Sequence, residues 1–172
     1  ILRGGFTVVN VNPLYTPREL EHQLKDSGAK ALFVLENFAH VLEKVLDATP
    51  VRHVILTSVG DMLQWPRRGI VNLAVRYLKR SVPRYHLPHA ARWREAMQRD
   101  AKQGFSPTAI SGSDLALLQY TGGTTGVAKG AMLTHRNLVA NLQQVAALWH
   151  SAIEPGREIV ITALPLYHIF SL

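Results

Sequence analysis

The apolar positions of this chain fall into short runs that alternate with helix-like spacings. Three β-branched or apolar runs in the first third are separated by two segments whose apolar residues recur every three or four positions. Strands are therefore expected at 6–11, 31–35 and 51–57, and helices at 17–27 and 38–46. This β-α-β-α-β order predicts an α/β fold with parallel strands joined by crossover helices.

The first of these helices carries signals for both of its ends. Thr16 is predicted to be the N-cap, and Pro17 suits the first helical position, where a missing N–H group costs nothing. Gly28 can adopt the left-handed conformation that ends a helix. Leu20 and Leu24 are spaced to form the buried stripe between these ends.

A second set of elements follows a loop rich in Gly, Ser and Pro at 104–113. Strands are expected at 115–120, 130–133 and 158–164, and a helix at 135–150. Thr134 is predicted to cap this helix, with His135 and Arg136 at its start. Its apolar residues are predicted to be buried: Leu138, Leu142, Val145, Ala146 and Trp149.

Positive charge is concentrated in residues 61–103. This segment holds ten Lys/Arg and three Asp/Glu, and it carries the whole formal charge of +7 because the rest of the chain is balanced. Within 69–82, apolar residues at 70, 71, 74, 75, 78 and 82 have helical spacing. The sequence predicts that Arg76, Lys79 and Arg80 occupy part of the opposite surface, with Trp65 and Trp93 near the ends of the basic run.

Three interpretations of the basic segment remain open. A helical insertion with a solvated basic face is favoured, because runs of charge usually face solvent. Contact with an anionic membrane through residues 65–99 is the second, because basic amphipathic helices with Trp lie on anionic lipid. Nucleic-acid binding is disfavoured, because no helix-turn-helix, zinc-finger or aromatic RNA-binding signature accompanies the charge.

The composition is typical of a globular protein of the cytoplasm, with the inner face of a membrane as the alternative location. Hydrophobic residues make up 47% of the chain, enough for a sizeable core. The absence of Cys excludes disulfides and thiolate metal sites. No apolar run reaches the length of a membrane-spanning helix, and most of the His residues lack the spacing of metal ligands.

The segment 120–130, Tyr-Thr-Gly-Gly-Thr-Thr-Gly-Val-Ala-Lys-Gly, carries the most specific chemistry. Its glycines let the backbone turn tightly and present N–H groups to an anion, its Thr hydroxyls add donors, and its Lys adds a mobile positive charge. The segment matches neither the Walker pattern nor G-x-G-x-x-G. It predicts a polyphosphate-binding loop with these candidate residues: Tyr120, Thr121, Gly122, Gly123, Thr124, Thr125, Gly126 and Lys129.

This loop resembles the phosphate-binding signature of the adenylate-forming acyl-CoA synthetases, although many members carry Pro where Ala128 stands. Residues 127–137 are most similar to the bacterial long-chain fatty-acid–CoA ligases. Segments 4–20 and 164–170 resemble two further motifs of the family, in the family's order. The resemblance covers nearly the whole chain and is weakest at 61–103.

The resemblance implies that the chain is an internal fragment of the large N-terminal domain of such an enzyme. In that interpretation 1–60 is a β-α-β-α-β portion, 61–103 is a basic, partly amphipathic helical insertion, and 104–172 is the α/β portion that bears the phosphate loop. The fragment alone is expected to be inactive, because the later nucleotide-binding motifs and the small C-terminal domain are absent from it.

The implied reaction joins a fatty acid to CoA with ATP and Mg²⁺. The loop would hold the β- and γ-phosphates, with Lys129 neutralising charge and Thr124 or Thr125 near a magnesium-bound phosphate oxygen; no protein metal ligand is assigned. Tyr167 and His168 would lie near the acyl carboxylate and the CoA channel. His168 would orient or gate rather than act as a base, because a carboxylate is already ionised near neutral pH. Lys129, His168 and Thr125 are the catalytic candidates.

Two alternatives stay open beside the fatty-acid ligase. One is an adenylate-forming ligase for another carboxylic acid, which would share the loop and differ in the acyl pocket. The other is a non-catalytic remnant that folds without turnover, against which the intact Thr, Gly and Lys set of the loop argues. The acyl-chain length and the oligomeric state are not specified by the sequence.

Overall fold

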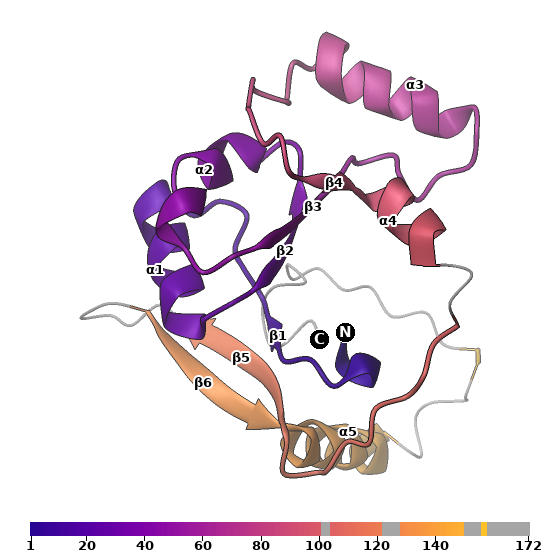
Figure 1. The fold of residues 1–172 in the computed structure, drawn as a ribbon. Helices are drawn as coiled ribbons and strands as arrows, with labels where there is room; N and C mark the ends of the chain where they lie inside the picture. Colours follow the sequence, from indigo (N-terminus) through magenta and orange to yellow (C-terminus); the bar gives the residue numbers. More distant parts are fainter. Residues whose placement is uncertain (101–103, 122–127, 150–155, 158–172) are drawn as a thin grey trace. The chain divides into compact units, whose positions relative to one another are not determined.

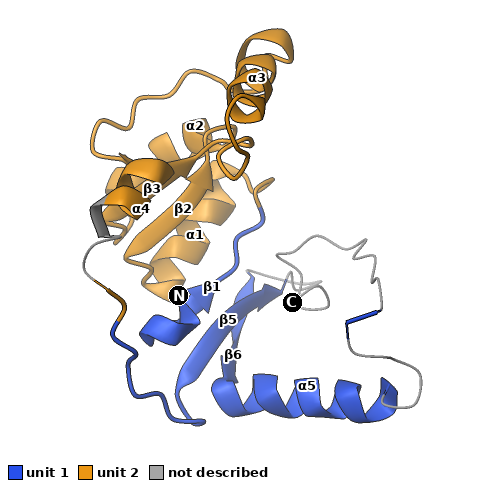
Figure 2. Cartoon of the chain, turned by 90° about the vertical axis from the view of Figure 1, so that its right-hand side faces the viewer, with its two compact units in different colours: residues 1–12, 106–172 blue, residues 13–105 orange. Residues whose placement is uncertain are grey.

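The computed structural model describes residues 1–100, 104–121, 128–149 and 156–157. The chain forms two compact units, residues 1–12 with 106–172 and residues 13–105 (Figure 2). Among the described residues, each unit contains one three-stranded sheet, and no described strand pairs across the two units.

The unit formed by residues 13–105 is built on a parallel sheet of order β2-β3-β4 (Figure 1). β2 (Ala31–Leu35) and β3 (His53–Thr57) pair along their whole length, and β4 (Ala91–Arg92) pairs with the middle of β3. α1 (Pro17–Ser27) and α2 (Ala39–Glu43) lie on one side of the sheet and α4 (Trp93–Asp100) on the other. Parallel strands with helices on both faces confirm the predicted α/β class.

Both predicted ends of α1 are confirmed. Thr16 Oγ1 accepts a hydrogen bond from the Glu19 backbone N–H at 3.4 Å, and the Glu19 carboxylate accepts one from the Thr16 N–H at 2.8 Å. These two bonds form a capping box, which satisfies two otherwise unpaired donors. At the other end Gly28 has φ 65° and closes the helix. Leu20 and Leu24 are buried, as their spacing predicted.

The other unit is built on a mixed sheet of order β1-β5-β6. β1 (Val8–Val9) runs parallel to β5 (Leu115–Thr121), and β6 (Lys129–Thr134) runs antiparallel to β5. The sequence predicted that this first strand lies in one parallel sheet with the strands at 31–35 and 51–57. That prediction was wrong. The reason is a non-local one: β1 finds its partner in β5, more than a hundred residues away in sequence.

α5 (His135–Trp149) follows β6 directly. Thr134 caps it as predicted, because its Oγ1 accepts from the Asn137 backbone N–H at 3.3 Å. The predicted burial of its apolar stripe was wrong: Leu142 is 64% exposed, and Val145, Ala146 and Trp149 are also exposed. Periodicity shows which residues share a face, but a face is buried only where another element covers it, and the described residues supply no such layer over α5.

The basic segment contains α3 (Arg67–Leu73), which continues as the π-helical η3 (Ala74–Leu78). The helix thus begins and ends earlier than the predicted 69–82. Ile70 and Leu78, two of the apolar residues with helical spacing, are exposed, and Arg76, predicted on the opposite surface, is partly buried. Among the described helices, none has the length and apolarity needed to cross a membrane.

Candidate functional site

The predicted phosphate loop joins the two strands of an antiparallel hairpin. In the β5–β6 register Tyr120 lies opposite Gly130, and Thr121 lies opposite Lys129. The Thr hydroxyl and the Lys ammonium therefore come from facing positions at the end of the hairpin, on either side of the connection 122–128. Both residues are exposed, so both can reach a ligand held at this end.

A close contact between Tyr120 and Gly130 supports the base of this hairpin. Tyr120 is only 7% exposed. A Cβ atom added to Gly130 would lie 3.0 Å from Cε2 and 3.1 Å from Cζ of the Tyr120 ring. Glycine at 130 therefore lets the ring lie directly over the β6 backbone, next to the pair that flanks the loop.

The structure brings together three of the predicted site residues, namely Tyr120, Thr121 and Lys129. Lys129 forms no ion pair with a described carboxylate. Within the described part of the chain, no cluster of His, Asp and Glu could hold a metal ion. The remaining predicted residues lie outside the described residues: Gly122, Gly123, Thr124, Thr125, Gly126, Tyr167 and His168.

Backbone hydrogen bonds fix the start of α5 at the end of the hairpin opposite the loop. The Arg136 N–H donates to the Gly112 carbonyl at 2.8 Å, and the His135 N–H donates to the Asp114 carbonyl at 3.1 Å. These bonds satisfy N–H groups that the first turn of a helix leaves without intrahelical partners. They agree with the predicted helix-start role of His135 and Arg136.

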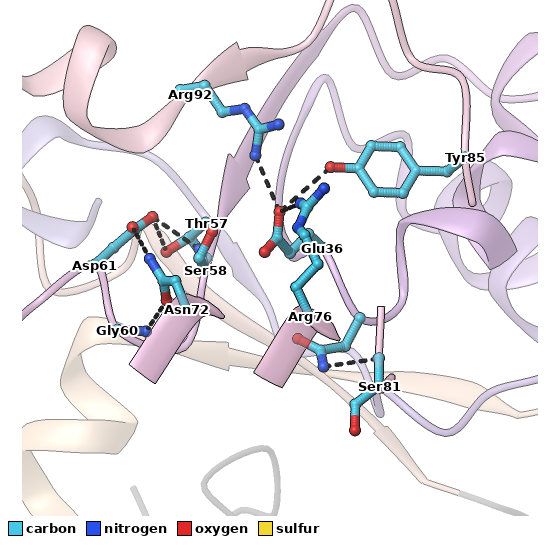
Figure 3. A network of polar contacts seen from close by, with 11 residues as sticks. Glu36, Thr57, Ser58, Gly60, Asp61, Asn72, Arg76, Ser81, Tyr85 and Arg92 are labelled. Atoms are coloured by element: carbon cyan, nitrogen blue, oxygen red, sulfur yellow. Dashed lines mark hydrogen bonds and ion pairs between the residues drawn. The ribbon is translucent and has the colours of Figure 1, made fainter. Parts of the chain in front are cut away.

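Sequence reasoning missed a buried carboxylate in the other unit. Glu36 is 3% exposed and directly follows β2. Its Oε2 lies 2.5 Å from the Arg76 guanidinium and 3.1 Å from that of Arg92, and it accepts a hydrogen bond from the Tyr85 hydroxyl at 3.5 Å (Figure 3). One signal was present in the sequence: an acidic residue placed immediately after a strand without polar residues.

The pKa of Arg76 is raised from its ordinary value in this cluster. Partial burial is the largest single influence and would lower it, but the charge of Glu36 and hydrogen bonding to that carboxylate outweigh burial. Arg76 therefore stays positively charged, and it pairs with Glu36 inside the same unit. This corrects the prediction that Arg76 belongs to the outward basic surface.

A second polar network, around Asp61, lies after the end of β3 (Figure 3). The Asp61 carboxylate accepts from the Ser58 N–H at 2.7 Å and from the Thr57 hydroxyl at 3.3 Å. Asn72 Nδ2 donates to Asp61 Oδ1 at 3.4 Å, and Asn72 Oδ1 accepts from the Gly60 N–H at 2.7 Å. Both networks lie at the carboxyl ends of parallel strands, where α/β sheets commonly bind ligands. Here residues at those strand ends bind Asn72 of α3 and Arg76 of η3.

Comparisons with known proteins cover the whole length of the chain. The family model described as "AMP-binding enzyme" matches residues 1–172. The chain is 60% identical over 172 residues to a long-chain-fatty-acid–CoA ligase of Salmonella typhimurium, covering 100% of this chain and 31% of that protein. The chain thus spans about a third of the length of the curated relatives it matches.

Solved structures give the same result at the level of the fold. A long-chain-fatty-acid-CoA ligase from Archaeoglobus fulgidus is 33% identical with a TM-score of 0.52, over 81% of this chain and 22% of that one. ATP-bound MatB from Rhodopseudomonas palustris has a TM-score of 0.66 at 23% identity, over 99% of this chain and 27% of that one. With the family model matching its whole length, this chain belongs to the AMP-binding enzyme family.

Proposed function

We propose that the protein carrying this chain is a long-chain fatty-acid–CoA ligase. The observation that carries the proposal is the pairing of Thr121 with Lys129 at the end of a hairpin whose connection is rich in Gly and Thr. This arrangement offers hydroxyl, backbone N–H and ammonium donors to a polyphosphate. The 60% identity to a curated ligase of this specificity supports the choice of substrate.

In the proposed reaction a fatty-acid carboxylate oxygen attacks the α-phosphorus of ATP. The bond to the β-phosphate oxygen breaks, and acyl-adenylate and pyrophosphate form. The CoA thiol then attacks the acyl carbon, loses its proton to solvent, and displaces AMP. The first step needs positioning and charge stabilisation more than a protein nucleophile. Lys129 is suited to this task because it holds a fixed strand position beside the loop, from which its ammonium would reach the departing pyrophosphate.

Several parts of the proposal concern residues outside the described ranges. Mg²⁺ would be held mainly by phosphate oxygens, with Thr124 or Thr125 nearby. Tyr167 and His168 would orient the acyl carboxylate or gate the CoA path.

The proposal also covers domain organisation and location. It assigns 1–60, 61–103 and 104–172 to one large domain. It includes a cytoplasmic location and contact with an anionic membrane through 65–99.

ATP–pyrophosphate exchange by the full-length protein, with a panel of carboxylic acids, tests this function. We expect exchange to be stimulated by long-chain fatty acids, and thioester to form when CoA is added. Exchange with only shorter, aromatic or amino acids would keep the mechanism and replace the substrate. A folded protein that binds ATP but exchanges with no acid would contradict the ligase and favour a non-catalytic role.

A further inference from the structure

We infer that Tyr120 is a positioning residue of the proposed ATP site, which acts by holding Lys129 opposite Thr121. Its ring lies over the backbone of Gly130 and fixes the register of the β5–β6 hairpin. The inference deepens the proposed function and rests on it in that ATP is the polyphosphate bound at this hairpin. All of its structural support comes from the unit formed by residues 1–12 and 106–172.

The loop end of the hairpin has little support from the rest of its described sheet. β1 lies along one edge of β5, and β6 lies along the other (Figure 1). β1 pairs with Leu117 and Leu118, whereas the β5–β6 pairing continues as far as Thr121 and Lys129. Among the described residues, positions 119–121 of β5 and their partners in β6 therefore form a two-stranded ribbon. Such a ribbon is marginally stable by itself in water, so its register depends on side-chain contacts between the strands.

Tyr120 supplies such a contact in this ribbon. It lies directly opposite Gly130 and is 7% exposed. A Cβ atom added to Gly130 would meet Cε2 and Cζ of the ring at 3.0 and 3.1 Å, so the ring fills the place where a side chain of β6 would stand. Glycine weakens the interior of a strand, and β6 is an edge strand of the described sheet. An aromatic side chain over a glycine in an edge strand compensates for this weakness and fixes the register of the pair.

The register of the hairpin decides where the Lys129 side chain stands. Successive side chains of a strand point to alternate faces, so Tyr120 and Gly130 belong to one face of the hairpin. Thr121 and Lys129 belong to the other face. A slip of one residue would turn Lys129 to the wrong face and separate it from Thr121. Tyr120 thus acts on the site through the β6 backbone, from the face opposite the hydroxyl and the ammonium.

The placement of Tyr120 distinguishes this role from direct binding of ATP. The composition of the loop put Tyr120 among the candidate phosphate contacts, but its side chain is buried against β6. Thr121 and Lys129, in contrast, are exposed on the other face. Substitutions at Tyr120 should therefore change the reaction only as far as they displace Lys129 and its partner.

A double-mutant cycle on ATP–pyrophosphate exchange by the full-length protein tests the inference. Tyr120→Leu removes the ring contact and should lower the exchange rate at saturating fatty acid by about tenfold, because small displacements of a catalytic group have large effects on rate. The KM for the fatty acid should stay unchanged. In the Lys129→Ala protein the same change should lower the rate by no more than about twofold, since its effect passes through the missing ammonium. Effects of the two changes that simply multiply would overturn the inference.

Two further variants separate positioning from general stability. Tyr120→Phe keeps the ring over Gly130 and should retain the exchange rate within about twofold. A rate as low as that of Tyr120→Leu would assign the effect to the hydroxyl and overturn the role of the ring contact.

Leu117→Ala is the matched control. Leu117 is 4% exposed in the same strand, but it lies beside β1 and further from the loop. The change should lower the thermal midpoint, because it leaves a cavity, without coupling to Lys129→Ala. Coupling as large as that of Tyr120→Leu would reduce the effect to general destabilisation and overturn the inference.

Protection of Lys129 by ATP gives a readout that does not depend on turnover. Mass spectrometry measures how fast acetic anhydride modifies Lys129 with and without Mg-ATP. We expect ATP to slow the modification in the unaltered protein, in Tyr120→Phe and in Leu117→Ala, but not in Tyr120→Leu. If Tyr120→Leu fails to fold, Gly130→Ala takes its place, because the added Cβ displaces the ring from the other strand. Protection that persists in a folded variant without the ring contact would overturn the inference.

The outcomes separate this inference from the proposed ligase. Coupled loss of exchange in Tyr120→Leu and Lys129→Ala supports both. Exchange by the unaltered protein that Tyr120→Leu leaves unchanged overturns the positioning role and keeps the ligase. Protection of Lys129 by ATP that depends on the Tyr120 ring, without exchange with any acid, supports the positioning role and contradicts the ligase. Failure of ATP to protect Lys129 in the unaltered protein overturns the positioning role.

Discussion

Thr121 and Lys129 lie opposite each other in the antiparallel pair of β5 and β6. The seven residues between them form the connection of the hairpin, so the strand register sets how its two ends approach. Cross-strand partners are neighbours on the same face of a sheet. A hydroxyl and an ammonium group are thereby held on one side of the hairpin end by backbone geometry, before any ligand is bound.

Replacing Lys129 with alanine should slow adenylation and leave the fold unchanged. Losing one charge-assisted contact to a phosphate costs about 1–3 kcal/mol, or roughly 5–150-fold in rate. Because Lys129 is exposed, its removal opens no cavity. ATP–pyrophosphate exchange and thermal unfolding of the full-length protein measure the two quantities. Lys30→Ala, another exposed lysine, is the control, and a rate for Lys129→Ala equal to the control's would remove Lys129 from the site.

Replacing Gly130 with alanine should disturb the base of the hairpin through Tyr120. The added Cβ would meet the ring at 3.0 Å, which forces the ring or the strand to move. Overpacking of this kind costs typically about 1–3 kcal/mol. The backbone of Gly130 does not have the positive φ that favours glycine, so the contact alone sets the effect. We expect a lower thermal midpoint and weaker ATP binding.

A double variant and a second glycine check this assignment. Tyr120→Leu combined with Gly130→Ala should be less destabilised than the sum of the single variants, because the clash requires the ring. Gly69→Ala has open space at its Cβ and lies within α3, so it should stabilise slightly, since alanine favours helix by about 1 kcal/mol. Additive effects of the Tyr120 and Gly130 changes would argue against a direct contact.

Local signals in the sequence predicted the structure correctly where it depends on bonds between residues close in sequence. Thr16 and Gly28 set the ends of α1 because a cap needs partners only three or four residues away. The predicted phosphate loop rests on local sequence in the same way, because its Gly, Thr and Lys residues are contiguous. Its position between two antiparallel strands follows from the short apolar runs on either side.

The missed features depend on partners that are distant in sequence. Arg76 was predicted to face outward because periodicity alone assigns apolar residues to the core, but Glu36, 40 residues earlier, attracts it inward. Val8 of β1 pairs with Leu117 of β5 for the same kind of reason. Leu142 on α5 shows a second limit of periodicity. The apolar spacing groups residues on one face of the helix, but it does not show whether another element covers that face.

Replacing Arg76 with glutamine should loosen α3 and η3. The change leaves the Glu36 carboxylate buried with Arg92 as its remaining cation. Breaking a fully buried pair costs about 3–5 kcal/mol, and we expect a smaller loss, on the order of 1–3 kcal/mol, because the Arg76 side chain is 38% exposed. Amide hydrogen exchange over 67–78 should accelerate. Lys79→Gln is the matched control, since Lys79 is exposed and unpaired among the described residues; equal acceleration in both variants would exclude the Glu36 anchor.

The capping box of α1 should make the start of that helix sensitive to acid. Hydrogen bonds from the Thr16 side chain and backbone hold the pKa of Glu19 below its ordinary value of 4.5. A lowered pKa in the folded state means that the stabilisation is fully present above pH 4.5 and is lost as the pH falls through the folded-state pKa.

Hydrogen exchange or NMR of the first α1 turn across this acidic range measures the effect. Glu19→Gln can still accept from the Thr16 N–H but carries no charge, so it should remove the pH dependence and retain part of the cap. Glu43→Gln, at the last position of α2 and outside any capping box, is the control and should leave the acid response of α1 as it is. An acid response that persists in Glu19→Gln would assign it to another group. Thr16→Ala should weaken the cap at every pH, by about 1 kcal/mol, because it removes the acceptor for the Glu19 N–H itself.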